Sequence, residues 1–171
     1  RGEEPPGPNM LAGRAFHSLL EDAEPGELTT AARDGWQFSF ALDAAIALPA
    51  VRELKAEEVF QTPSGPVTLV GKVDSIDGIV VHDYKLTERF EAERYADSYQ
   101  WRAYLAMFGA QRFVYDVFQG RYVGQQVTIY DYHRFPLAAY PGMRADVERA
   151  VAGLAEIVAA HVPQKIMADA E

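Results

Sequence analysis

Two neighbouring segments in the middle of the chain are rich in apolar residues, and this pattern predicts two β-strands. The segments cover residues 67–76 and 79–84, and Asp77-Gly78 lies between them. A two-residue Asp-Gly sequence between strand-like segments is a strong hairpin signal, because both turn positions favour a positive φ angle. The sequence therefore predicts an antiparallel hairpin here.

Three charged residues are expected on this hairpin. Asp74 lies near the end of its first strand, and Asp83 and Lys85 lie in its second strand. Side chains alternate between the two faces of a strand, so Asp83 and Lys85 should share one face and Tyr84 should occupy the other. Unpaired charge in a mostly buried sheet is costly, and a divalent cation would remove that cost. Carboxylate oxygens suit Mg²⁺ or Mn²⁺, and a lysine beside them can orient or deprotonate a water molecule.

Helical periodicity, with capping residues, glycine and proline at the ends, predicts four helices. They are expected at residues 9–23, 29–48, 91–108 and 143–161. Besides the hairpin, extended segments are expected at residues 51–62, 112–119 and 122–132, the last two joined at Gly120-Arg121. Helices and strands interleave along the chain, which predicts an α/β domain with a central sheet.

Length and composition agree with one globular domain. The chain has 171 residues, of which 49% are hydrophobic and 24% are charged. We expect residues 1–8 to be a flexible lead-in, residues 9–163 to be the domain and residues 164–171 to be a tail. The absence of cysteine excludes disulfides, thiolate zinc sites and iron–sulfur clusters. The sequence also has no membrane-spanning apolar segment and no signal-peptide pattern. Together these features predict a cytoplasmic protein without a membrane partner.

Two residue pairs on predicted helices are further candidates for a site. His17 and Glu21 are spaced i and i+4 in the first helix, and Gln100 and Tyr104 have the same spacing in the third. Such residues more often face water or pack in the core, so the spacing alone leaves the roles of both pairs open. Glu57 or Glu58 could lie beside Asp74, although an exposed strand position is the simpler interpretation for both.

Four motifs in this order resemble those of the PD-(D/E)XK nuclease superfamily, and more narrowly those of its RecB-type, exonuclease-like branch. They are Gly13-x-x-x-His17-x-x-Leu20-Glu21, Gly71-x-x-Asp74, Asp83-x-Lys85 and Gln100-x-x-x-Tyr104. The resemblance spans roughly residues 10 to 135 and implies a restriction-endonuclease-like mixed central sheet flanked by helices. The chain departs from the superfamily's general pattern in having Gly71-Lys72-Val73, and no proline, before the first acidic residue, as is common in the RecB-type branch. It also lacks the phosphate-binding loop of a helicase.

The resemblance implies a nuclease that hydrolyses phosphodiester bonds with Mg²⁺ or Mn²⁺, and specifically a DNA exonuclease. DNA repair, recombination and phage or CRISPR-type DNA processing are the expected settings, with DNA as substrate and a helicase or recombination protein as candidate partner. The implied metal ligands are Asp74, Asp83, the backbone carbonyl of Tyr84 and His17. Lys85 would position or deprotonate the attacking water. Gln100 and Tyr104 would support the site and contact the DNA strand.

Three basic residues next to these motifs are candidate phosphate contacts, namely Arg14, Lys72 and Arg102. The net charge of −9 argues against a protein that coats nucleic acid through charge alone, but it does not exclude a nuclease with local basic residues. Two other functions therefore stay open. One is a catalytically silent module of the same fold that binds nucleic acid, and the other is a metal-dependent hydrolase of small phosphoesters.

Overall fold

A computed structural model describes residues 6–24, 28, 30–42, 46 and 48–161. The tail expected at residues 164–171 and most of the lead-in expected at residues 1–8 lie outside this part of the chain. None of the helices in the described part is long and apolar enough to cross a membrane.

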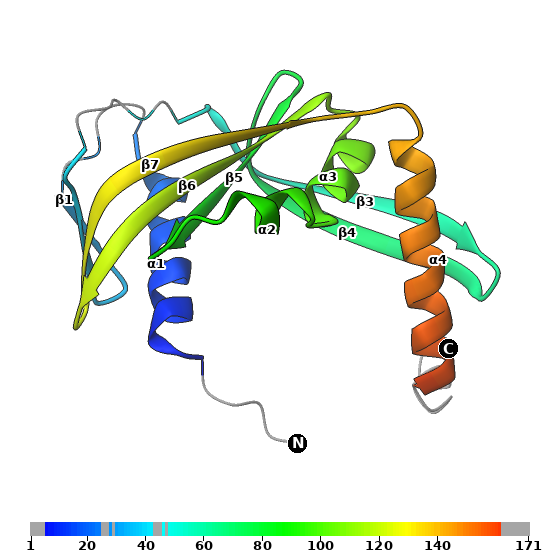
Figure 1. The fold of residues 1–171 in the computed structure, drawn as a ribbon, viewed down its shortest axis with the longest axis horizontal. Coiled ribbons are helices and arrows are strands. Elements are labelled where there is room, and N and C mark those ends of the chain that lie inside the picture. The colour runs from blue at the N-terminus through cyan, green and yellow to red at the C-terminus, as the bar shows by residue number, and fades with distance from the viewer. Residues whose placement is uncertain (1–5, 25–27, 29, 43–45, 47, 162–171) are drawn as a thin grey trace.

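A mixed sheet of seven strands, in the order β1-β2-β7-β6-β5-β4-β3, organises the structure (Figure 1). The strands are β1 (Thr30–Arg33), β2 (Trp36–Phe40), β3 (Val51–Thr62), β4 (Gly65–Asp77), β5 (Val80–Thr87), β6 (Arg112–Val123) and β7 (Gln126–Ala138). β2 runs parallel to β7 and β5 runs parallel to β6, whereas the other neighbours are antiparallel. The predicted mixed central sheet is therefore confirmed.

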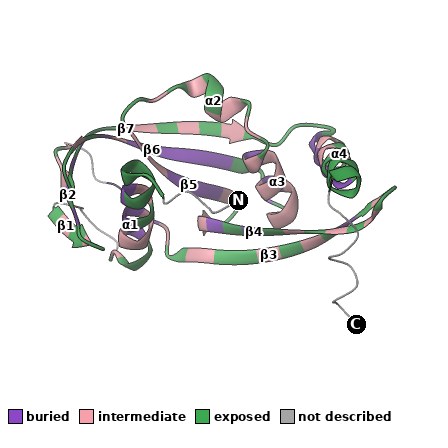
Figure 2. Ribbon diagram, turned by 90° about the horizontal axis from the view of Figure 1, so that it is seen from below, coloured by how far each residue is buried: buried purple, intermediate pink, exposed green. Residues whose placement is uncertain are grey.

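Helices cover both faces of this sheet. They are α1 (Pro8–Asp22), α2 (Ala92–Ala96), α3 (Gln100–Phe108) and α4 (Met143–His161). Consecutive residues of β6 show the division: Phe118 packs in the core under α1, and Val117 packs in the core under α3. α4 lies beside α3 and against β3 and β4, at the other end of the sheet from α1 (Figure 1). The central strands β5 and β6 are consequently the most buried (Figure 2).

The helix expected at residues 29–48 is wrong. Residues 30–40 instead form the hairpin β1–β2, whose turn at Asp34-Gly35 has positive φ angles of 48° and 81°. Trp36 and Phe38 are both buried because alternate strand residues face the core under α1. The Asp-Gly turn signal that located the central hairpin was present here too.

Three element boundaries also differ from the prediction. The turn between β6 and β7 contains Gly124, with φ of 59°, and does not lie at Gly120-Arg121. Gly120 lies inside β6 at a shift in strand register, where a Cβ atom would come within 2.9 Å of Val127 Cγ1. The helix expected at residues 91–108 is divided into α2 and α3. α1 begins at Pro8, one residue before the predicted start, and Gly7 is its N-cap.

Candidate active site

The candidate site lies where β4 and β5 separate. Their ladder contains three residue pairs, and the pair farthest from the hairpin turn is Ser75 with His82. Beyond this pair, the earlier residues of β4 are paired with β3 only. Asp74 precedes Ser75 and bridges the gap that opens between the two strands. The backbone N–H of Tyr84 donates a hydrogen bond to Asp74 Oδ2 over 2.7 Å. The carboxylate thus replaces the ladder partner that this backbone group has lost.

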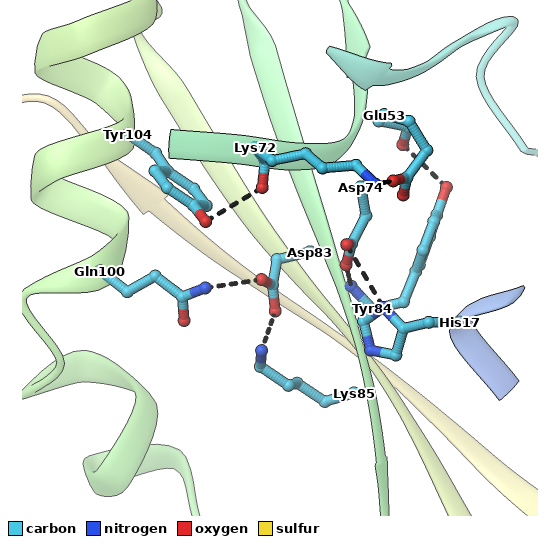
Figure 3. A network of polar contacts seen from close by, with 10 residues as sticks. His17, Glu53, Lys72, Asp74, Asp83, Tyr84, Lys85, Gln100 and Tyr104 are labelled. Atoms are coloured by element: carbon cyan, nitrogen blue, oxygen red, sulfur yellow. Dashed lines mark hydrogen bonds and ion pairs between the residues drawn. The ribbon is translucent and has the colours of Figure 1, made fainter. Parts of the chain in front are cut away.

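Asp83 is a buried carboxylate with few donors around it. Only 4% of the residue is exposed. Gln100 Nε2 donates to its Oδ1 over 2.9 Å, and Lys85 Nζ lies 2.6 Å from its Oδ2 in an ion pair (Figure 3). Oδ2 accepts no hydrogen bond of regular geometry. Burial raises the pKa of Asp83 to about 6, and the nearby charge of Asp74 adds to this effect although Lys85 opposes it.

Lys85 is an ammonium donor in the same cleft. Burial alone would lower its pKa, but the charges of Asp83 and Asp74 outweigh that effect and raise the pKa above its usual value. The side chain keeps 32% of its surface exposed, so it reaches the cleft while it contacts Asp83. Lys85 is therefore charged at neutral pH and can donate hydrogen bonds there.

His17 reaches Asp74 from α1, whereas Gln100 reaches Asp83 from α3 (Figure 3). His17 Nδ1 lies 3.3 Å from Asp74 Oδ1. Burial lowers the pKa of His17, but the hydrogen bond with Asp74 and the charges of both aspartates raise it by more. The two helices thus bring one polar side chain each to the two carboxylates.

Tyr104 and Lys72 are joined at the α3 side of β4. The hydroxyl of Tyr104 donates to the carbonyl of Lys72 over 3.0 Å. A Cβ atom on Gly71 would lie only 3.0 Å from the Tyr104 ring, so a larger residue there would push the ring away from β4 by a few tenths of an ångström. The Lys72 ammonium itself pairs with Glu53.

Two clefts flank Lys85 and Leu86, and they hold most of the other candidates. The cleft on the α1 side measures about 540 Å³, and the cleft on the α3 side measures about 660 Å³. The first is lined by, among others, Arg14, His17, Glu21, Glu53, Lys72 and Asp74. The second is lined by, among others, Arg89, Arg94, Tyr95, Gln100 and Tyr115.

Arg102 and Glu57 do not join this group. Arg102 lines neither cleft; its guanidinium donates to the carbonyl of Ser98 over 2.9 Å and lies 4.3 Å from the centre of the Trp101 ring. Glu57 pairs with Lys55 on the exposed surface of β3.

Glu53, Arg89 and Arg94 line the clefts but were missed from the sequence. Glu53 has a φ of 57° and is skipped in the β3–β4 pairing, opposite Asp74. Nothing in the local sequence indicates this irregularity, because it depends on how the two strands pair. Arg89 and Arg94 lie in the charged segment after Lys85. Their closeness in the chain to Lys85 was the one sequence feature that could have indicated a place beside the site.

The site suits a hard divalent cation with an incomplete protein ligand set. Asp83 offers a buried oxygen without a regular hydrogen bond, and Asp74 lies on the neighbouring strand. Among the described residues, no three His, Asp or Glu side chains converge closely enough to hold a metal by themselves. Two carboxylates, with water and substrate oxygens completing the shell, are a usual arrangement for Mg²⁺.

Comparison with known proteins gives one family match. The family model for the PD-(D/E)XK nuclease superfamily matches residues 2–166. A solved structure, the crystal structure of SSO0001, is similar with a TM-score of 0.47 and 14% sequence identity, over 66% of this chain and 51% of that one. The chain thus spans about half the length of that protein. No curated protein matches the sequence.

Proposed function

The chain belongs to the PD-(D/E)XK nuclease superfamily, and we propose that it is a metal-dependent DNA exonuclease of the RecB-type branch. The observation that carries the proposal is the buried Asp83 carboxylate, which is held by Gln100 and Lys85 beside Asp74. Burial raises the pKa of Asp83 to about 6 because its neighbours compensate its charge incompletely, and a bound cation would supply the missing positive charge.

The groups that would hold Mg²⁺ or Mn²⁺ are Asp74, Asp83, the Tyr84 carbonyl and His17. The chemistry supplied there by a bound cation is neutralisation of charge on the scissile phosphate and a lower pKa for a bound water. Gln100 fixes the rotamer of Asp83 through its hydrogen bond, and Tyr104 fixes the β4 backbone through the Lys72 carbonyl. Both residues therefore act by positioning the carboxylates.

Lys85 would donate hydrogen bonds to the attacking water or to a phosphate oxygen. Because its pKa is raised by the two aspartates, its ammonium form dominates, and a positioning role is favoured over proton removal. Its contact with Asp83 places that donor directly beside the carboxylate.

DNA would cross the site through the two clefts that meet at Lys85. Arg14 and Lys72 line one cleft and Arg89 and Arg94 line the other, so each cleft offers basic side chains for phosphates. The net charge of −9 leaves little general attraction for DNA, and binding should depend on these local cations or on a helicase or recombination partner.

The experiment that tests the proposal is a digestion of end-labelled linear DNA and of circular DNA in Mg²⁺ or Mn²⁺, with a chelator as control. We expect nucleotides to be released from linear DNA while circular DNA stays intact. Cleavage of the circle would instead indicate an internal nuclease. Binding without cleavage would support the catalytically silent module, and turnover of p-nitrophenyl phosphate alone would support the small-phosphoester hydrolase.

The pKa values of the site predict how metal affinity depends on pH. The pKa of Asp83 is about 6, and protonation removes the negative charge that a cation needs. Affinity for Mn²⁺ should therefore be nearly constant well above pH 6 and should fall by about tenfold per pH unit below it, since one proton competes with the metal. Calorimetric titration with Mn²⁺ at several pH values, without DNA, measures this dependence.

The same titration tests His17. Its pKa is raised above 6.5, so if the imidazole is a ligand, affinity should already begin to fall above the pH range in which Asp83 titrates. His17→Ala should remove this upper part of the profile and weaken Mn²⁺ binding at neutral pH. Identical profiles for both proteins would show that His17 is not a ligand.

A further inference from the structure

Two buried hydroxyls lie directly behind the candidate metal ligands. Ser75 follows Asp74 on β4, and Tyr84 follows Asp83 on β5. Successive side chains point to opposite faces of a strand, so Tyr84 faces away from the Asp83 carboxylate. Ser75 lies on the same face as Tyr84, because it pairs with His82 in the ladder and contacts the Tyr84 hydroxyl. Ser75 Oγ and the Tyr84 hydroxyl oxygen are 2.8 Å apart, and the two residues are 0% and 3% exposed.

We infer that the Ser75–Tyr84 hydrogen bond is a positioning device that sets the distance between Asp74 and Asp83 for metal binding. This inference rests on the proposed function. It assigns neither hydroxyl a contact with metal or DNA, and both act through the aspartate that precedes them in the chain.

The need for such a contact comes from the separation of the strands. The β4–β5 ladder ends at Ser75 and His82, so Asp74 and Asp83 lie just beyond the last regular pair. Two side-chain hydrogen bonds in the described structure cross the opening. One uses Asp74 itself as acceptor for the Tyr84 N–H, and the other is the hydroxyl pair. A cation that draws on the Asp74 oxygens competes with the first contact but leaves the second unchanged.

Tyr84 is suited to this role because its ring is packed in the core and its hydroxyl stays protonated. Its ring packs in the core under α1, 6.4 Å from the ring of Phe118. Burial raises the pKa of Tyr84 to about 12, so the hydroxyl stays neutral throughout the range in which Asp83 titrates. The link is therefore present whether or not Asp83 carries its charge.

The test separates positioning from plain stability by removing the two hydroxyls singly and together. Tyr84→Phe should weaken Mn²⁺ binding about tenfold, the lower end of the usual effect for residues that support metal ligands. Thermal stability should fall as well, because a buried Ser75 hydroxyl is left without a partner. In Ser75→Ala/Tyr84→Phe no hydroxyl is orphaned, so stability should recover in part. Mn²⁺ affinity should stay low in this double variant, because the link between the strands is still absent.

Tyr132→Phe is the matched control. It removes the hydroxyl of a half-buried tyrosine that packs against the same core, donates to Asp116 on β6 and contacts neither candidate ligand. We expect a lower melting temperature and Mn²⁺ affinity equal to that of the wild type. Ser75→Ala breaks the same link from the other strand, so the test remains decisive if Tyr84→Phe does not fold.

Two results would overturn the inference alone, provided that the wild type binds Mn²⁺. One is unchanged affinity in Tyr84→Phe and Ser75→Ala. The other is an affinity that recovers together with stability in the double variant, which would make the hydrogen bond only a structural contact. A wild-type protein that neither binds Mn²⁺ nor cleaves DNA would overturn the proposed function and this inference with it.

Discussion

Asp83→Asn should reduce metal-dependent DNA cleavage by about 10³-fold or more, because a metal ligand contributes several kcal/mol of transition-state stabilisation. The asparagine has the same shape, so the packing around this 4%-exposed residue should be kept. The folded protein should also tolerate the loss of charge. The raised pKa means that proton binding at Asp83 favours folding at low pH, and that this contribution is lost as pH rises through about 6. The ionised carboxylate is therefore not a net source of stability at neutral pH.

A second buried aspartate provides the control for this variant. Asp116 is 2% exposed and lies 2.7 Å from His82 Nδ1. It pairs with Tyr84 in the β5–β6 ladder, which places it on the sheet face away from Asp83. Asp116→Asn should lower the melting temperature but keep the cleavage rate within a few fold of the wild type. Wild-type rates of the pure Asp83→Asn protein in Mn²⁺ would contradict the assignment of Asp83.

The part of the site that follows from a single hairpin could be predicted from sequence. Asp83 and Lys85 share a strand face, and the structure accordingly brings their charged groups within 2.6 Å. Strand alternation is a local property that two neighbouring strands suffice to produce. The positions of His17 and Gln100 are different, because an i, i+4 spacing says which residues share a helix face but not where the helix packs. Their place beside the hairpin was expected only from the family resemblance.

Arg102 was predicted as a phosphate contact because it lies next to the Gln100 motif, but helix geometry argues against this prediction. It lies two residues after Gln100, and residues spaced i and i+2 do not face the same side of a helix. Gln100 points to Asp83. The Arg102 guanidinium instead packs on the Trp101 ring and donates to the carbonyl of Ser98, between α2 and α3. The spacing alone thus indicated that both could not face the same cleft.

The β1–β2 hairpin depends on pairing with a distant segment, whereas the Glu53 irregularity depends on how the consecutive strands β3 and β4 pair. Aromatic residues at 36, 38 and 40 fit a strand with one buried face, but nearby apolar residues also fit a helix. The strand is favoured because β2 pairs with β7, whose sequence lies almost 90 residues later, as the pair Gln37 and Gln126 shows. Long-range pairing of this kind decides between two locally acceptable structures.

Lys85→Ala should lower the single-turnover rate of DNA cleavage by about 10²- to 10⁴-fold, the usual loss for one well-placed catalytic group. Metal binding should respond in the opposite direction. Lys85 Nζ occupies Asp83 Oδ2 at 2.6 Å and competes with any cation for that oxygen. Its removal should therefore leave Mn²⁺ affinity unchanged or increase it. A lysine that acts only as counter-ion for the two aspartates would give the second effect without the first.

The measurement is single-turnover cleavage at saturating Mn²⁺, made on the same preparation as metal and DNA titrations. Lys55→Ala is the matched control, because this lysine pairs with Glu57 on the exposed surface of β3 and lines neither cleft. It should keep the wild-type rate and both affinities. A collapsed rate with intact binding in Lys85→Ala places Lys85 at the reacting atoms. A retained rate would show that the Asp83-x-Lys85 spacing serves only the ion pair, and the small-phosphoester hydrolase would then account better for the acidic charge of the chain.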